Sequence, residues 1–228
     1  MSADHGDAVA LRPPSSGTRI AATGESLMAV FAATIFLSAC LLFVVQPLVG
    51  KVLLPWFGGA PAVWTTCMLF FQVLLLMGYG WAHLLARQAP RRQALAQLGL
   101  LALAVGAMAI GTIAWGRPLI PDESLKPPDS LYPAARLILL LALAVGLPYL
   151  ALSTTGPLLQ AWFARVHPGR SAYRLYALSN AGSLLALVSY PFLVEPALSL
   201  KTQGWVFAIG FALFAAGSAL IALRTQAV

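Results

Sequence analysis

Long apolar runs, separated by short polar segments, set the pattern of this chain. The runs are of roughly membrane-spanning length, about 20 residues each, and lie at 27–49, 63–86, 95–115, 136–163, 173–194 and 204–223. This pattern predicts an all-α fold, a multi-pass transmembrane bundle of about six helices over residues 27–223. Residues 1–26 are polar and contain Pro13 and Pro14, so we expect a disordered cytoplasmic tail there, and a short cytoplasmic tail at 224–228.

Composition supports a membrane protein. The chain is 60% hydrophobic and 9% charged, whereas an ordinary soluble domain is about 45–50% apolar and about 25% charged. The net charge of +7 would suggest nucleic acid in a soluble protein, but the basic residues here lie in short segments between the apolar runs. They are therefore interpreted as membrane topology signals. The expected partner is the lipid bilayer, and no nucleic acid is expected.

The basic residues are distributed unequally between the two sides that six spans define. One side holds nine of them: Arg12, Arg19, Arg87, Arg91, Arg92, Arg165, Arg170, Arg174 and Arg224. The other side holds five: Lys51, Arg117, Lys126, Arg136 and Lys201. The more basic side is usually cytoplasmic, so both termini are predicted to be in the cytoplasm.

The fourth run is too long for a simple span. Residues 136–163 would form a helix of about 42 Å, longer than the roughly 30 Å hydrocarbon core. Pro148 and the Gly156-Pro157 pair can bend or break it, and Ser153, Thr154 and Thr155 lie between them. One interpretation is a kink whose freed carbonyls accept from these hydroxyls; the other is a discontinuous helix that lines a site. We predict an interruption between Pro148 and Pro157.

Polar residues inside the spans form two stripes. In the second span the stripe consists of Thr65, Gln72, Tyr79 and His83, and in the fifth of Tyr176, Asn180 and Ser183. They either join helices by hydrogen bonds or contact a ligand along a pathway. Because a primary amide facing lipid is costly, Asn180 is predicted to face the interior, hydrogen-bonded near Gln46 or Gln72.

Small residues suggest where helices approach closely. Gly99, Ala102 and Gly106 in the third span, and Gly210 and Gly217 in the sixth, are expected to permit close packing. At the end of the first span, Lys51 is either an anchor that reaches the headgroups or a contact for an anionic substrate group. The candidate pathway or ligand-contacting residues are Gln46, Lys51, Gln72, Ser153, Thr154, Thr155, Tyr176, Asn180 and Ser183.

Several kinds of chemistry have no candidate residues. No Asp or Glu lies inside a span, the three histidines are far apart, and there is no phosphate-binding glycine loop. Cys40 and Cys67 fall inside apolar runs; Cys40 matches a lipoprotein cleavage site, but an apolar run continues beyond it. We therefore expect no enzyme, no catalytic residue, no metal and no cofactor.

Two stretches carry a family resemblance. The first includes Phe36-Leu37-Ser38-Ala39, Gln46-Pro47-Leu48, Leu53-Leu54-Pro55 and Pro61-Ala62-Val63-Trp64; the second is 176–187, followed by Ser189-Tyr190-Pro191-Phe192. They resemble the membrane part of fused major-facilitator/spermidine-synthase-like proteins, in which a helix bundle precedes a soluble aminopropyltransferase-like domain. Because this chain ends at Val228, the resemblance implies the membrane module alone. It also implies an integral protein of the bacterial inner (plasma) membrane.

Two function classes remain open. One is a transporter-like module that passes or channels a small molecule; the other is a non-catalytic subunit or anchor of a membrane complex. Either would use a protein partner or a second copy as a homo-oligomer. Polar stripes that converge on one cavity would favour the first class, and stripes used up in helix contacts would favour the second.

Overall fold

The computed structural model describes residues 16–126 and 132–226, with side chains from residue 26 onward. Its long helices are α1 (Ser16–Leu53), α2 (Pro61–Ala86), α3 (Pro90–Trp115), α5 (Leu147–Val166), α6 (Tyr173–Ser189) and α8 (Leu200–Thr225). Helix α4 (Pro133–Leu141) continues into α5 through a π-helical turn at Ala142–Gly146, and a second π turn, Tyr190–Val194, joins α6 to α7 (Glu195–Ala197). Short 3₁₀ turns lie at Leu54–Phe57 and Glu123–Leu125.

The all-α prediction and its six spans are confirmed. The described residues contain no strand, and six helical segments are long and apolar enough to cross a membrane. These are Ser26–Phe57, Pro61–Ala86, Pro90–Trp115, Pro133–Val166, Tyr173–Ala197 and Leu200–Thr225. Each contains one of the apolar runs of the sequence, and the chain is therefore an integral membrane protein by the length and composition of its helices.

Proline and glycine set several helix ends. Pro61, Pro90 and Pro133 each occupy the first position of a helix, where a missing N–H costs nothing and the fixed φ suits the helix. Gly116 follows α3 with a φ of 69°, the left-handed conformation that ends many helices. These residues place the connections between spans close to where the apolar runs end.

The first helix begins earlier than the sequence suggested. Helix α1 starts at Ser16, so residues 16–26, predicted as part of a disordered tail, are helical. The stretch Ile20-Ala21-Ala22 consists of residues compatible with a helix, and a helix already nucleated by the apolar span extends cheaply by one residue at a time. The remainder of that tail, 1–15, and residues 227–228 of the C-terminal tail lie outside the described residues.

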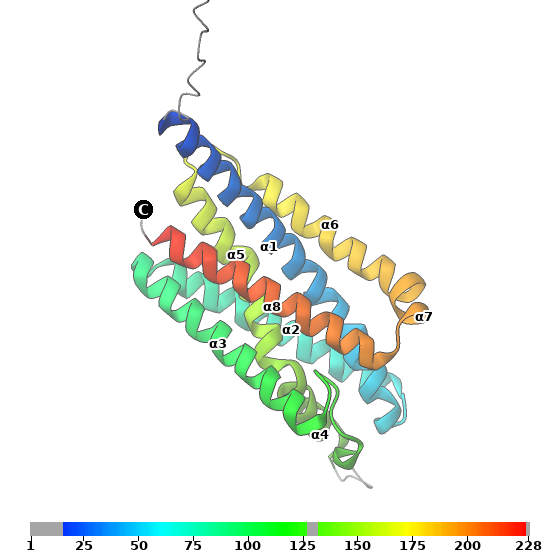
Figure 1. The fold of residues 1–228 in the computed structure, drawn as a ribbon. Coiled ribbons are helices and arrows are strands. Elements are labelled where there is room, and N and C mark those ends of the chain that lie inside the picture. Colours follow the sequence, from blue (N-terminus) through cyan, green and yellow to red (C-terminus); the bar gives the residue numbers. More distant parts are fainter. Residues whose placement is uncertain (1–15, 127–131, 227–228) are drawn as a thin grey trace, which may run out of the picture.

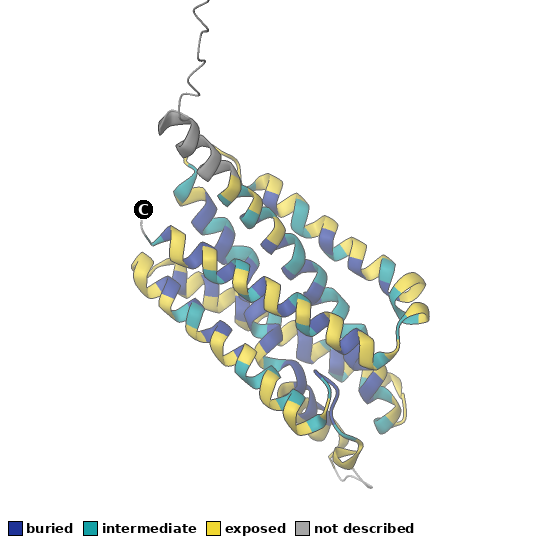
Figure 2. Cartoon of the chain, viewed as in Figure 1, coloured by how far each residue is buried: buried dark blue, intermediate teal, exposed yellow. Residues whose placement is uncertain are grey.

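Helices α1 and α5 form the centre of the bundle. Helix α1 packs against α6, α8 and α5, and α5 also packs against α2 and α3 (Figure 1). In the fourth span 61% of the apolar stretch is buried, against 22% in the second and 17% in the third and fifth. Figure 2 shows the same division, with exposed residues along the outer helices. The outer helices therefore present broad apolar faces to lipid.

The predicted interruption of the fourth span is wrong. Helix α5 continues from Leu147 through Pro157 to Val166. The irregularity lies earlier, in the π turn at Ala142–Gly146, where the extra residue accommodates the ring and the missing N–H of Pro148. The hydroxyls of Ser153, Thr154 and Thr155 donate to the carbonyls of Leu150 and Ala151. Pro157 has no N–H, so it leaves the carbonyl of Ser153 without a helical hydrogen bond. None of these three hydroxyls donates to that carbonyl.

The small-residue prediction holds for the sixth span and fails for the third. A Cβ on Gly210 would lie 3.0 Å from Leu41, and one on Gly217 would overlap the Thr34 hydroxyl, so α8 lies close to α1 through both glycines. Gly99 and Gly106 of α3 have no atom within 4 Å of the corresponding position. A small residue on a lipid-facing side has the same sequence spacing as one at a helix contact, so spacing does not identify the packed face.

The two ends of the described chain lie together. The start of α1 and the end of α8 are at the same end of the bundle (Figure 1), as an even number of spans requires. The assignment of this end to the cytoplasm rests on the arginine distribution and stays a prediction.

Candidate functional site

A polar cleft separates two pairs of helices. Helix α1 packs along α6 and helix α2 along α5, and the space between the pairs is a cavity of about 360 Å³. Its polar wall comes from all four helices: Ser38, Tyr79, Ser153, Gln160, Tyr176, Ser179, Asn180 and Ser183. The cavity lies between spans, in the half of the bundle nearer the described chain ends, and lipid around a span offers polar side chains no partners.

Helix α6 supplies half of this polar wall. Tyr176, Ser179, Asn180 and Ser183 are spaced by three, one and three residues, so they form a single helical stripe that faces the cleft. Asn180 lines the cavity but is exposed, and it forms no hydrogen bond with any described residue. The predicted bond near Gln46 or Gln72 is therefore wrong: the Gln46 amide donates to Leu42 and Tyr149 instead, and Gln72 is exposed on α2.

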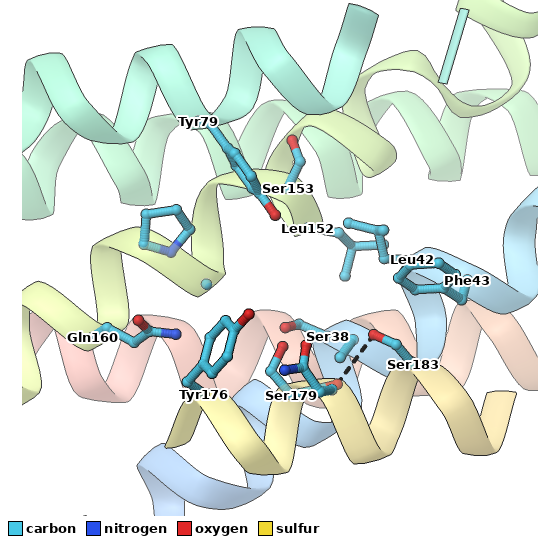
Figure 3. A pocket seen from close by; sticks show the side chains of 14 residues that line it. Ser38, Leu42, Phe43, Tyr79, Leu152, Ser153, Gln160, Tyr176, Ser179 and Ser183 are labelled. Carbon is cyan, nitrogen blue, oxygen red and sulfur yellow. Dashed lines mark hydrogen bonds between the residues drawn. The ribbon is translucent and has the colours of Figure 1, made fainter. Parts of the chain in front are cut away.

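The opposite wall comes from α2 and α5. Figure 3 shows the hydroxyls of Tyr79 and Tyr176 pointing into the space from opposite sides. Gly156 and Pro157 also line it. The Gly156-Pro157 pair thus borders the cavity, and helix α5 continues through it. Glycine has no side chain, which leaves room for the cavity beside the backbone.

The cleft has hydrogen-bonding capacity that the protein does not use. Ser38, Ser153 and Ser183 each donate to a carbonyl of their own helix, at 3.0, 2.8 and 3.1 Å. The side chains of Tyr79, Gln160, Tyr176, Ser179 and Asn180 form no hydrogen bond with any described residue. Two phenols, two amides and a hydroxyl are thus available to a ligand as both donors and acceptors.

The described lining is uncharged. It contains no Asp, Glu, Lys, Arg or His, and the described residues contain no group of three or more His, Cys, Asp and Glu side chains that could hold a metal ion. The chemistry of this cleft is therefore neutral hydrogen bonding together with contact to two aromatic rings.

Other candidate residues are used in contacts within and between helices. Gln46 donates to the Leu42 carbonyl and to Tyr149 Oη, both at 3.2 Å. Thr154 is fully buried and exchanges hydrogen bonds with Gln97 of α3 at 3.2 and 3.3 Å. These side chains therefore join helices, as one of the two interpretations of the polar residues predicted.

The polar stripe of the second span also contains residues used in contacts and a residue that lines the cleft. Thr65 donates to the Pro61 carbonyl of its own helix, and His83 contacts Arg87. Gln72 is exposed on α2 and forms no hydrogen bond with a described residue. Only Tyr79 of this stripe lines the cleft, because the cleft borders only the part of α2 near this residue.

Lys51 forms an ion pair. Its Nζ lies 2.7 Å from Oε1 of Glu195, with both side chains 41% exposed. The pair joins the end of α1 to the end of the fifth span, beside a second, largely apolar groove that Gln46, Trp64 and Tyr190 help to line. An acidic side chain of the protein therefore occupies the position next to Lys51 that an anionic substrate group was suggested to take.

Breaking this pair is expected to have a small, salt-dependent effect. Glu195→Gln should lower the free energy of unfolding by about 1 kcal/mol or less, because both groups are partly exposed. Thermal unfolding in detergent should show the decrease at low salt and little of it at 1 M salt, where screening is strong. The Lys51→Glu/Glu195→Lys exchange should recover most of the loss. An equal decrease at both salt concentrations would point to packing instead of charge.

Sequence reasoning missed four of the cleft residues as site candidates. Tyr79 was part of a stripe, Ser179 directly precedes Asn180, Gln160 lies three residues after Pro157, and Ser38 belongs to the Phe36-Leu37-Ser38-Ala39 stretch. Each lies close to a residue or motif that was singled out. The sequence does not show that α1 packs with α6 and α2 with α5. This packing brings the four residues to one cavity.

Comparison with known proteins gives no relative. No family model, no curated protein and no solved structure matches this chain.

Proposed function

We propose that this integral membrane protein binds a small, uncharged polar molecule in the cleft between the α1/α6 and α2/α5 pairs, and takes part in its passage across the membrane. The observation that supports the proposal is the convergence of Tyr79, Gln160, Tyr176 and Asn180 from three helices on one cavity, without hydrogen bonds to described residues. Polar groups are costly within a membrane and are found there mainly beside partners, ligands or water.

The uncharged lining supports a neutral ligand. A charged ligand taken out of water would need an opposite charge or a dense set of oriented dipoles, and no lining residue is ionised at neutral pH. Phenol, amide and hydroxyl groups suit a molecule with several hydroxyl or amide groups, and the two tyrosine rings suit its less polar face. Such a ligand would also satisfy the amide of Asn180.

The family resemblance agrees with this proposal. The stretch 176–187, which resembles the membrane part of fused major-facilitator/spermidine-synthase-like proteins, supplies one wall of the cleft. We propose accordingly that the chain acts as a transporter-like module of the bacterial inner membrane, without catalysing a reaction itself.

Water access to the cleft tests the proposal. In a variant in which Cys40 and Cys67 are alanine, Ser183→Cys should react with a small, charged, membrane-impermeant thiosulfonate reagent, because a ligand site for a polar molecule must be hydrated when empty. The matched control is Leu184→Cys, one residue along the same helix, exposed and outside the cleft lining. This cysteine should react at least about tenfold more slowly, since a thiol in hydrocarbon does not ionise to the reactive thiolate.

Equal and slow reaction at both positions would contradict a hydrated site. That outcome would favour the second candidate function, a non-catalytic subunit whose polar surface is covered by another protein. One observation favours this candidate: Gln72 lies exposed on α2 without a hydrogen bond to any described residue, and a lipid-facing amide is costly. A covering subunit would satisfy it.

A further inference from the structure

A separate cavity, distinct from the polar cleft and from the groove beside Lys51, lies at the end of the bundle away from Lys51 and Glu195. Its volume is about 630 Å³, and it is bordered by α1, the end of α5, the α5–α6 connection and α6. The wall is apolar and includes Met28, Phe163 and Leu178, whereas Arg170, Ser171 and Arg174 are polar and exposed. One cavity therefore combines an apolar lining with two guanidinium groups.

The two arginines lack an acidic partner in the described part of the chain. Arg170 donates from Nη1 to the thioether sulfur of Met28 at 3.0 Å, and a thioether is a weak acceptor. The Lys51–Glu195 pair is the one ion pair among the described side chains. The acidic residues whose side chains are described, Asp122, Glu123 and Glu195, lie at the opposite end of the bundle, so no described carboxylate neutralises the two guanidinium groups at this cavity.

The position of the cavity corresponds to a membrane interface. The fourth span ends at Val166 and the fifth begins at Tyr173, so residues 170–174 lie where the chain emerges from the hydrocarbon region. Tyr173 is exposed and lies beside the ring of Tyr176, with ring centroids 6.5 Å apart. Tyrosine is common at the headgroup level, where one end of the side chain meets lipid and the other meets water.

We propose that this cavity binds an anionic phospholipid, with the phosphate at Arg170 and Arg174 and the upper part of an acyl chain along Met28, Phe163 and Leu178. Arginine suits phosphate because its planar guanidinium presents two parallel N–H donors to two oxygens. Basic pockets between membrane helices on the cytoplasmic side recognise lipid headgroups in this way. This end of the bundle is also the one that the arginine distribution predicts to be cytoplasmic.

The apolar wall distinguishes a lipid from a free phosphate. A small inorganic anion would contact the arginines and leave the apolar surface of Met28, Phe163 and Leu178 uncovered. A phospholipid covers both surfaces at once, and burial of apolar carbon adds to its affinity. The occupant that fits the whole cavity is therefore the lipid.

The test measures lipid binding to the purified full chain in mild detergent. Native mass spectrometry and thermal unfolding should show phosphatidylglycerol binding at least about tenfold more tightly than phosphatidylcholine with the same acyl chains. The Arg170→Gln/Arg174→Gln variant should lose at least about tenfold in phosphatidylglycerol affinity, because each basic residue near an anionic headgroup contributes roughly fivefold. Arg92→Gln is the matched control: an exposed arginine at the same end, outside this cavity, whose loss should leave the affinity unchanged.

A second variant tests the apolar half of the site. Leu178→Trp fills the apolar wall and keeps both arginines, so it should also weaken phosphatidylglycerol binding, while the unfolding temperature without lipid reports whether the variants are folded. The proposal is overturned if the two lipids bind equally, if Arg92→Gln weakens binding as much as the double variant, or if Leu178→Trp leaves binding intact. It is overturned as well if inorganic phosphate stabilises the protein as much as the lipid does.

Discussion

Replacing Gly78 by alanine should destabilise the protein by about 1–3 kcal/mol, the usual cost of forcing extra atoms into a packed contact. A Cβ at this position of α2 would overlap the hydroxyl oxygen of Ser153 in α5 and lie 2.7 Å from its Cβ. The Ser153 Cβ is fixed to the backbone, so rotation of the side chain cannot relieve the contact. The two helices would have to move apart, and the unfolding temperature in detergent should fall accordingly.

Gly80 provides the matched control for Gly78. It lies on the same helix, with no atom within 4 Å of the position of an added Cβ. Gly80→Ala should leave stability unchanged or raise it slightly, because alanine favours a helix more than glycine does. Adding Ser153→Gly to Gly78→Ala should restore much of the loss. Equal effects of the two alanine substitutions would mean that helix propensity, and not the α2–α5 contact, governs this position.

Gln93→Leu should cost about 3 kcal/mol or more in the free energy of unfolding. The Gln93 side chain is 1% exposed, and its Oε1 accepts hydrogen bonds from Trp162 Nε1 at 2.7 Å and Arg165 Nη2 at 3.1 Å. Its Nε2 donates to the carbonyls of Gln88 and Ala86, at 2.7 and 3.3 Å. Leucine would leave several of these partners unsatisfied, and each buried unsatisfied group costs about 1–3 kcal/mol.

The same substitution at Gln160 separates hydrogen bonding from hydrophobicity. Gln160 lines the cleft and has no hydrogen bond to a described residue, so Gln160→Leu should change the unfolding temperature little. Gln93→Leu should lower it by several degrees in the same detergent. A similar small change at both positions would show that the amide of Gln93 does not hold the α2–α3 connection to α5 as its geometry indicates.

The number and type of the elements followed from the sequence alone. Six long apolar runs in a chain with 9% charged residues leave few alternatives, because in lipid each backbone polar group must be satisfied within its own helix. Proline at the start of a run and glycine at its end act on neighbouring atoms, so local sequence also determines several helix ends. The extension of α1 to Ser16 was missed, since a helix can continue into a segment without its own apolar pattern.

Contacts between helices were decided by the tertiary structure. Gly210 and Gly99 look alike in sequence, yet only Gly210 lies against another helix. Asn180 was expected to bond to an amide of another helix, but the Gln46 amide donates to Tyr149 instead, and the cleft lies between Asn180 and helix α2. In lipid the apolar face of a helix can meet either hydrocarbon or another helix, so hydrophobic periodicity does not determine which face is packed.

The sequence predicted about half of the polar residues that line the cleft. Ser153, Tyr176, Asn180 and Ser183 were singled out because polar side chains in a span need a partner, and that energetic reasoning does not depend on the fold. Gln46 and Thr154 met the same criterion, but they are used in contacts with Tyr149 and Gln97. The sequence by itself determined six membrane helices and which polar groups are costly there. Only the packing of α1 with α6 and of α2 with α5 decided which of those groups face one another, because that depends on distances between residues far apart in the chain.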